Sequence, residues 1–357
     1  KKTIGNLYPE ILITDEMLDY RPDLKPYLGK KLKVIAWIWT RTVMSPNPSF
    51  SQIHIPLANT FLLSSRSGKE AYIQPIIYKD GYKFVVRKGK PENYEEIKKG
   101  TKLARGAKFK CLMSGTPIDS DYVKKEGREG RMRHKLMAIV VQGEKKRLYL
   151  NPLSEHENIA NNITPQWQPT TPIGNDPRAL WTPPYGLKMH GDLYTKRQLV
   201  TLTKLCDLIS EVQIKIDKDI SEINCSDKHS SHSENNSYSS YGKDICLYLA
   251  FKISKLADLN NSLTPWGHIQ ECPLHLFSMH AIPMAWDFSE ANPFSGSSGS
   301  WDVISRGIEK SLESITPTRH SKKDYVYQLD AVSQNLSAGK IVSTDPPYYD
   351  NIGYADL

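Results

Sequence analysis

The sequence lacks the patterns that mark secreted and membrane proteins. Its five cysteines in 357 residues are scattered, without the regular spacing of a disulfide framework. No stretch approaches the roughly 18 consecutive apolar residues of a membrane-spanning helix, and no signal peptide opens the chain. These absences argue against a disulfide-stapled secreted domain and against a membrane partner. They predict a soluble protein of the reducing cytoplasm.

Acidic residues are outnumbered: 47 Lys and Arg stand against 39 Asp and Glu, which gives a net charge of +8. This excess favours a polyanionic partner, although many basic proteins bind no nucleic acid. Positive charge is concentrated between Lys98 and Arg147, where glycines at 127 and 130 would let a loop approach DNA phosphates. A solvated protein face is the alternative, and for Arg197 a surface ion pair. The basic residues predicted to contact DNA are Lys124, Lys125, Arg128, Arg131, Arg133 and Arg197.

The most specific motif is Asp345-Pro346-Pro347-Tyr348. Ile341 and Val342 are expected to end a buried strand, and neither proline can donate to a ladder, so the motif is predicted in a loop at a strand's carboxyl end. Its first two residues offer a carboxylate and a free carbonyl that can each accept one N–H of a nucleobase amine. The tyrosine ring can stack on a base swung out of the duplex. A strand terminator without chemistry is the alternative.

The longer string, DPPYYDNIGYADL, resembles the amino-methyltransferases that methylate adenine or cytosine amines, and in particular the adenine-specific DNA methylases with a zinc-ribbon insertion. The resemblance implies a Rossmann-like sheet, S-adenosyl-L-methionine as cofactor and double-stranded DNA as partner. It assigns catalysis to Asp345, Pro346, Pro347 and Tyr348. Because those methylases have a glycine-rich cofactor loop upstream of the segment that begins here at Lys1, the chain is expected to be an internal fragment.

Three further segments resemble the same methylases: residues 36–43, 194–199 and 279–301. In the last of these, Asp287 and Asn292 are expected to border the cofactor cleft, while Asp330 is expected to bind the adenosine end of the cofactor. Two alternatives remain open. The stretch 292–299 can be read as the cofactor loop itself, and Asp330 can be read as a helix cap.

The sequence departs from these methylases at both zinc knuckles. Ser45 and Phe50 in the first knuckle, and Ser114 in the second, occupy positions where cysteines are expected, so that only Cys111 remains. A structural zinc site needs four ligands, and the nearby His54 supplies at most one substitute. We therefore expect no zinc. Burial of the phenyl ring at position 50 is expected to replace part of the lost stability.

The predicted fold is α/β: part of a Rossmann-like methyltransferase sheet with a β-rich, degenerate zinc-ribbon insertion. Strands are expected at 32–39, 71–78, 82–87, 137–141, 147–150, 325–329 and just before 345, and helices at 192–209, 244–259 and 302–312. Trp37 and Trp39 share one face of the first strand and are expected in the core. The predicted regions are 1–45 and 279–357 (methyltransferase core), 46–150 (basic insertion), 151–190 (extended connector) and 191–278 (helices with a mobile loop at 225–242).

The sequence thus predicts an S-adenosylmethionine-dependent DNA methyltransferase acting on the exocyclic amine of adenine. The alternatives are a nucleic-acid-binding module without catalysis, and an amino-methyltransferase acting on cytosine, RNA or protein. The connector also contains Thr182-Pro-Pro-Tyr185, which mimics the motif. Because it lacks the carboxylate and a preceding strand, no chemistry is expected there.

Overall fold

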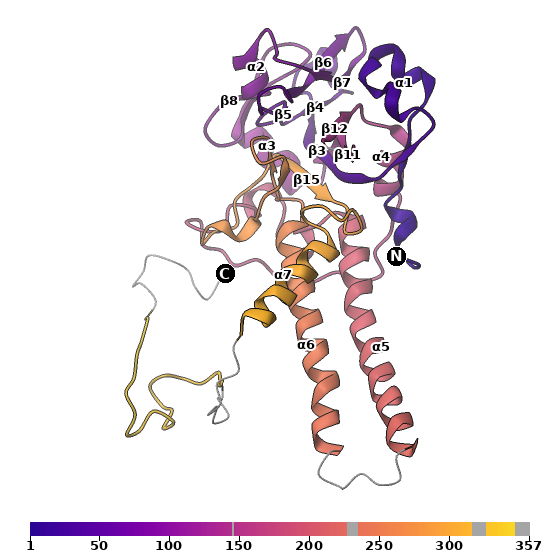
Figure 1. The fold of residues 1–357 in the computed structure, drawn as a ribbon. Coiled ribbons are helices and arrows are strands. Elements are labelled where there is room, and N and C mark those ends of the chain that lie inside the picture. Colours follow the sequence, from indigo (N-terminus) through magenta and orange to yellow (C-terminus); the bar gives the residue numbers. More distant parts are fainter. Residues whose placement is uncertain (145, 227–234, 316–325, 347–357) are drawn as a thin grey trace.

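The structure is a computed structural model that describes residues 1–144, 146–226, 235–315 and 326–346. It is a mixed α/β fold whose antiparallel sheets curl into a half-barrel, with two long helices extending from it (Figure 1). The strands are β1 (Ile11–Leu12), β2 (Lys31–Leu32), β3 (Val34–Met44), β4 (His54–Pro56), β5 (Leu62–Ser64), β6 (Ala71–Tyr78), β7 (Gly81–Lys88), β8 (Lys102–Ala104), β9 (Lys108–Lys110), β10 (Pro117–Ile118), β11 (Arg133–Gln142), β12 (Arg147–Leu150), β13 (Trp266–Gly267), β14 (Cys272–Pro273) and β15 (Asp287–Ala291).

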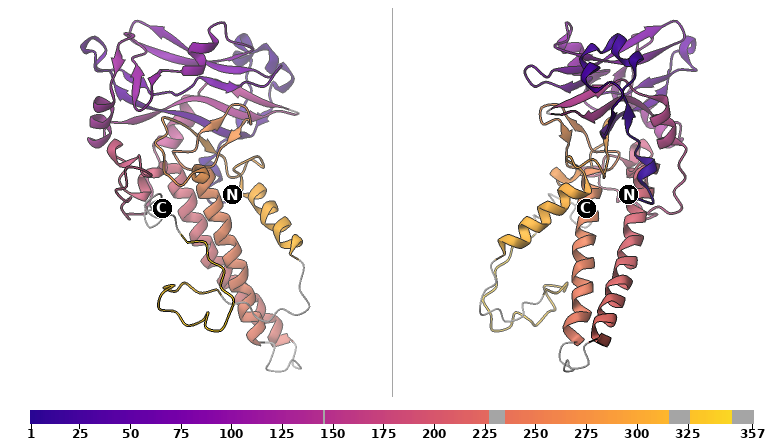
Figure 2. Two further views of the ribbon diagram at one scale, coloured as in Figure 1. Left: turned by 90° about the vertical axis from the view of Figure 1, so that its left-hand side faces the viewer. Right: turned by 45° about the vertical axis from the view of Figure 1, so that its right-hand side comes forward.

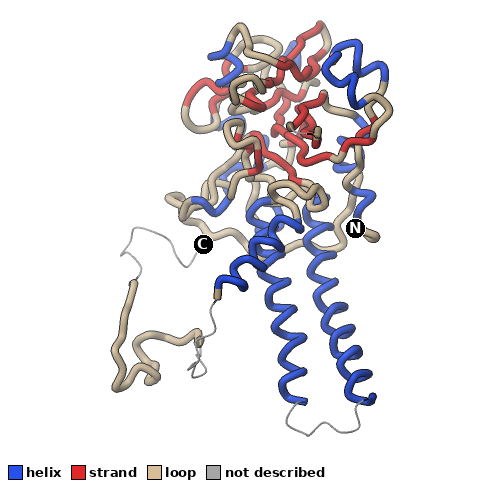
Figure 3. The backbone as a smooth tube through the Cα atoms, in the orientation of Figure 1, coloured by secondary structure: helices blue, strands red, loops and turns tan. Residues whose placement is uncertain are grey.

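The α-helices are α1 (Asp15–Tyr20), α2 (Tyr94–Lys99), α3 (Ser120–Arg128), α4 (Ser154–Asn161), α5 (Lys196–Ser226), α6 (Asn235–Leu259) and α7 (Trp301–Ser314). Short 3-10 helices are η1 (Gly5–Leu7), η2 (Pro22–Tyr27), η3 (Pro48–Phe50), η4 (Pro183–Tyr185), η5 (His190–Leu193) and η6 (Leu276–Ser278). The strands gather at one end of the molecule and the long helices project from the other (Figure 3).

Strand β3 is the centre of the largest sheet, in which the order is β12-β11-β3-β15 and β4 also pairs with β3. Its side chains alternate between two cores. Trp37 and Trp39 pack on one face with Phe288, whereas Ala36 and Ile38 pack on the other. Burial on both faces explains the nearly continuous apolar run of β3, and the prediction that both tryptophans are core residues is confirmed.

The sequence-based strands at 32–39, 71–78, 82–87, 137–141 and 147–150 correspond to β3, β6, β7, β11 and β12. The central sheet combines strands from the predicted regions 1–45, 46–150 and 279–357. Three strands of the basic β-rich segment, β4, β11 and β12, therefore share a sheet with the flanking segments, while β5 to β10 form two separate sheets.

The parallel Rossmann-like sheet is not found in the described residues, where every pair of named strands is antiparallel. The strands predicted at 325–329 and before 345 are also wrong for the described residues 326–346, which contain none. Ile341 is fully exposed and Val342 is 58% exposed. This stretch lies apart from the sheets (Figures 1 and 2), so no neighbouring strand accepts its backbone hydrogen bonds.

The two predicted helices after residue 191 are confirmed as α5 and α6, which pack side by side as an antiparallel hairpin (Figure 2). Helix α5 extends to Ser226 and α6 begins at Asn235, so both helices reach into the range 225–242 that was predicted as a loop. Residues 227–234 lie outside the described residues. The helix predicted at 302–312 is α7. No helix among the described residues is both long and apolar enough to cross a membrane.

Candidate functional site

A buried ion pair joins α5 to the central sheet. The Nε and Nη2 atoms of Arg197 donate to the two carboxylate oxygens of Glu290 at 2.9 and 2.8 Å, and neither side chain is exposed. Nη1 donates to the carbonyl of Leu7 at 3.0 Å, and the guanidinium lies 4.0 Å from the ring centroid of Trp37. The pair therefore connects the N-terminal segment, β3, α5 and β15.

A capping box at the start of α5 places Arg197. The backbone N–H of Thr195 donates to the side chain of Gln198, and the backbone N–H of Gln198 donates to the hydroxyl of Thr195. These reciprocal bonds satisfy donors that a helix start leaves free. The Thr195 hydroxyl also donates to Glu290 at 3.0 Å, so the cap and the ion pair form one network. The Thr-x-x-Gln spacing is a sequence signal that could have located this helix start.

A second buried arginine, Arg41 on β3, orients a histidine near this pair. Arg41 donates to the carbonyls of Ala285 and Ser262 and to Nε2 of His134 at 3.1 Å. Because Arg41 can only donate, the neutral imidazole accepts at Nε2 and carries its proton at Nδ1. Burial, together with the charge of Arg41, lowers the pKa of His134 to about 3. His134 is therefore a neutral hydrogen-bonding group at physiological pH.

A pocket of about 420 Å³ opens beside these groups, a size in the range of small-ligand sites. The polar side chains that line it are Trp39, Arg133, His134, Asn161, Tyr194, Thr195, Lys196 and Glu290. Glu290 already accepts three hydrogen bonds. The indole Nε1 of Trp39 is buried and has no partner among the described residues. The lining thus offers more donors than free acceptors, which suits a ligand rich in acceptors or negative charge.

Of the predicted catalytic residues, the two that the structure describes, Asp345 and Pro346, do not line this pocket. Asp345 and Pro346 lie in an exposed loop, and Pro347 and Tyr348 fall outside the described residues. Asp330 is exposed as well, and its carboxylate accepts from the backbone of Val332 and the hydroxyl of Ser333. Asp330 thus caps a turn at residues 331–333 rather than a helix, so the helix-cap alternative is not met in the described residues.

Asp287 is the first residue of β15, a strand that was not predicted, and Asn292 directly follows its last residue. The Asn292 side chain donates to the Val34 carbonyl at 2.8 Å and accepts from the Phe294 backbone at 2.9 Å. Asp287 accepts from the backbone of Asn59 at 2.6 Å, and burial raises its pKa to about 6. Both side chains have structural partners, and they do not converge on one cleft.

The prediction that Arg197 contacts DNA is wrong for this structure, because its side chain is fully buried. The predicted basic segment is also partly neutralised. Arg131 is paired with Glu126 and Glu129, and Lys124 lies 3.4 Å from Asp121. Acidic residues interleaved in the sequence cause this neutralisation. Of the six residues predicted to contact DNA, Lys125, Arg128 and Arg133 are exposed and have no carboxylate partner among the described residues.

Three of the four degenerate zinc-knuckle positions, Ser45, Cys111 and Ser114, lie close together. The hydroxyl of Ser45 lies 3.5 Å from the sulfur of Cys111, which sits at the turn between β9 and β10. Burial raises the pKa of the Cys111 thiol, but hydrogen bonds with Ser114 and Ser45 bring it below its ordinary value. Among the described residues, no group of three or more His, Cys, Asp or Glu could hold a metal.

The core beneath these knuckles is apolar, and it does not include Phe50. That ring is only half-buried, contrary to expectation, whereas Val43, Phe109 and Trp286 are buried together. Since Trp286 comes from the segment preceding β15, distant chain segments stabilise the insertion. The sequence around the knuckles could not reveal this partner.

The segments 36–43, 194–199 and 279–301 meet at the Arg197–Glu290 pair. Trp37 lies in the first segment, Arg197 in the second and Glu290 in the third, and they are in direct contact. Comparisons with protein families, with curated proteins and with solved structures found no match.

Proposed function

We propose that this chain is part of an S-adenosylmethionine-dependent DNA methyltransferase that acts on the exocyclic amine of adenine. The observation that carries the proposal is the Asp345-Pro-Pro-Tyr348 motif within its longer matching string. The convergence of the other three resembling segments on one ion pair supports it. The proposed catalytic fold is a Rossmann-like sheet; in the described residues the stretch before Asp345 is exposed and forms no strand.

The proposed chemistry depends on holding a poor nucleophile. The lone pair of a nucleobase amine is delocalised into the ring, so the enzyme must orient both N–H bonds and favour a tetrahedral nitrogen. The carboxylate of Asp345 accepts one N–H and the carbonyl of Pro346 accepts the other. The ring of Tyr348 stacks on the extruded base.

The residues nominated for the cofactor do not form a site for it in the described part of the chain. Asp287 and Asn292 are engaged in structural hydrogen bonds, and Asp330 caps an exposed turn. In the alternative cofactor loop, 292–299, Gly299 packs tightly, because an added Cβ would lie 2.8 Å from that of Ala291, whereas Gly296 has open space around it. We therefore assign no step to the cofactor through these residues.

The test is transfer of a labelled methyl group to duplex DNA by the whole protein. Asp345→Ala should lower turnover about a hundredfold or more, because the orienting carboxylate acts in the transition state. Duplex affinity should stay within about twofold. Asp219→Ala, which removes an exposed carboxylate from α5, is the matched control and should leave turnover unchanged.

Normal methylation by Asp345→Ala would show that the motif is not the catalytic loop. Duplex binding without methyl transfer by the unsubstituted whole protein would favour the alternative, a nucleic-acid-binding module without catalysis.

A further inference from the structure

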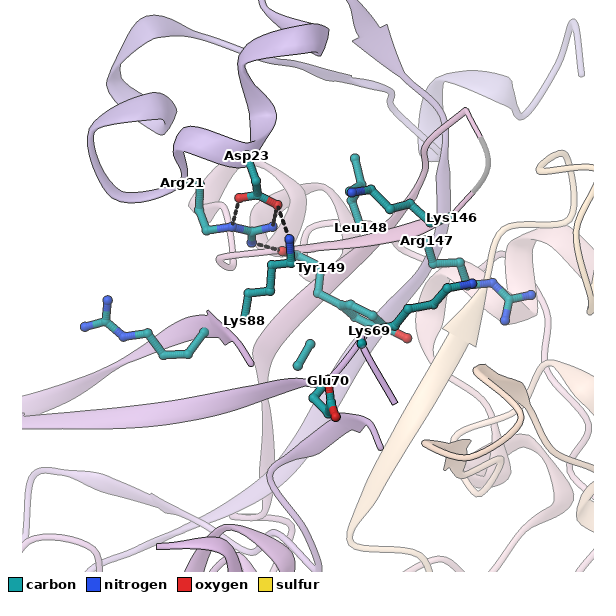
Figure 4. A pocket seen from close by; sticks show the side chains of 12 residues that line it. Arg21, Asp23, Lys69, Glu70, Lys88, Lys146, Arg147, Leu148 and Tyr149 are labelled. Atoms are coloured by element: carbon teal, nitrogen blue, oxygen red, sulfur yellow. Dashed lines mark hydrogen bonds and ion pairs between the residues drawn. The ribbon is translucent and has the colours of Figure 1, made fainter. Parts of the chain in front are cut away.

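A small basic pocket lies between η2, the turn before β6, the end of β7 and the start of β12 (Figure 4). Six cationic side chains and two carboxylates line it, which leaves an excess of four positive charges. The cations are Arg21, Lys69, Arg87, Lys88, Lys146 and Arg147. Because they come from segments far apart in the sequence, no single charge run revealed this cluster.

One wall of the pocket is fixed. The Arg21 side chain is only 8% exposed, and its Nε and Nη2 atoms donate to Asp23 at 2.7 and 3.0 Å. Its Nη1 donates to the backbone carbonyl of Tyr149 on β12 (Figure 4). Lys88 lies 4.0 Å from the same carboxylate of Asp23. Two cations thus share one carboxylate, and the wall keeps a net positive charge.

The remaining four cations have no carboxylate partner among the described residues. One of them, Arg87, donates to the side-chain oxygen of Gln74 at 2.9 Å. Lys69 and Lys146 are exposed, and their side chains form no hydrogen bond or ion pair with the residues that the structure describes. Arg147 is held without an acid: it donates to the carbonyl of Gln270 at 3.4 Å and to the hydroxyl of Ser297 at 3.3 Å. The side chains of Lys69, Lys146 and Arg147 are therefore available to an external anion.

The rim of the pocket is open to a polymer. Gly68, with a φ of 74°, forms a chain turn at its edge, and an added Cβ there would meet nothing within 4 Å. The pocket volume is about 50 Å³. Since one water needs about 10–15 Å³ of such space, the pocket takes a group of about three to five non-hydrogen atoms. That is the size of a phosphate group and too small for a nucleobase.

We propose that this pocket binds one phosphate of a nucleic-acid backbone. The excess positive charge supplies affinity without sequence information, and the open rim lets the neighbouring sugars pass. The choice of DNA as the polyanion rests on the proposed function. Phosphate binding itself requires no methyl transfer, so the two proposals fail separately.

The test compares two double variants of the whole protein in duplex binding, measured by fluorescence anisotropy over a range of salt concentrations. Lys69→Ala/Lys146→Ala removes two charges from the pocket, and Lys215→Ala/Lys218→Ala removes two charges from the second half of α5. The pocket variant should bind about tenfold more weakly, with a salt slope smaller by about 1, as expected for one lost phosphate contact. The α5 variant should stay within about twofold of the unsubstituted protein.

Equal weakening by both double variants would overturn the proposal, because only overall charge would then matter. Inorganic phosphate provides the second arm. Suppose that phosphate raised the melting temperature of the unsubstituted protein but not of the pocket variant, and that both proteins bound the duplex with equal affinity. The ligand would then be a free anion and the proposal would be wrong. A charge reversal, Lys69→Glu/Lys146→Glu, should weaken duplex binding further than the alanine pair.

Discussion

Arg197 and Glu290 lie 93 residues apart in the sequence and form a two-point ion pair from which solvent is excluded. Such a pair is a weak net source of stability, but removal of one partner leaves a buried charge without compensation. Glu290 also accepts a hydrogen bond from the hydroxyl of Thr195, and Arg197 donates one to the carbonyl of Leu7. The pair therefore fixes how the helical hairpin meets the sheet. Its integrity should therefore control the stability of the described fold.

Glu290→Gln should lower the free energy of unfolding by about 3–5 kcal/mol, because it leaves the Arg197 guanidinium buried and unpaired. Denaturant unfolding measures the change. Glu129→Gln is the control: its partner Arg131 is exposed, so the cost should stay below about 1 kcal/mol. A double variant, Arg197→Leu/Glu290→Leu, should cost less than Glu290→Gln alone. Similar costs for the two single variants would contradict this account.

Gly127→Ala should destabilise the protein by about 1–3 kcal/mol, because the added Cβ would overlap the backbone carbonyl of Tyr185. This close approach explains what the Thr182-Pro-Pro-Tyr185 segment does: it packs on α3, and its tyrosine ring lies 4.9 Å from that of Trp286. Gly307→Ala, in α7 with open space around it, is the helical control and should stabilise by about 1 kcal/mol. Thermal unfolding of the two variants separates these effects.

The sequence predicted the strands whose apolar residues face a core, and it failed where structure depends on distant partners. β3 was predictable because β-branched and aromatic residues fill both of its faces. β15 was missed because Ser289 and Glu290 are polar, yet both are fully buried and their hydrogen-bond partners come from residues 264 and 197. At Ile341 and Val342 the error was the reverse: a strand was predicted where the structure has none. Local propensity cannot show whether a neighbouring strand exists.

The candidate site was only partly predictable for the same reason. Segments 36–43, 194–199 and 279–301 were singled out, but nothing in their spacing revealed that Arg197 pairs with Glu290. Its predicted role as a DNA contact assumed a surface position. Likewise, the charge run at 98–147 was visible in the sequence. The pairing of Arg131 with Glu126 and Glu129 emerges only from the folded geometry.

Acidification should destabilise the protein through two neutral histidines. Burial and neighbouring arginines lower the pKa of His134 to about 3 and of His156 to about 4, against about 6.5 in an unfolded chain. Between pH 6.5 and 4 the unfolded chain binds protons that the folded chain does not, so stability falls as pH falls. Asp287 acts in the opposite direction: its raised pKa, about 6, makes stability fall as pH rises from about 4 to 6.

His134→Gln, which keeps an acceptor for Arg41, should reduce the loss of stability on acidification by at most about 1.4 kcal/mol per pH unit. Asp287→Asn should instead make stability fall more steeply as pH is lowered, because it removes the opposing contribution. Denaturant unfolding at pH 6, 5 and 4 measures both slopes. An unchanged slope in His134→Gln would show that this imidazole is protonated in the folded protein.

The degenerate knuckles should be able to regain a metal. The unsubstituted protein should contain no stoichiometric zinc by elemental analysis, because Ser45, Phe50 and Ser114 supply no thiolate. Ser45 and Ser114 already contact Cys111. Replacing Ser45, Phe50 and Ser114 by cysteine should therefore create a four-thiolate site that binds one zinc per chain and raises the melting temperature. The same triple variant with Cys111→Ser should bind zinc poorly. One zinc per chain in the unsubstituted protein would instead show that other residues, His54 among them, complete a site with Cys111.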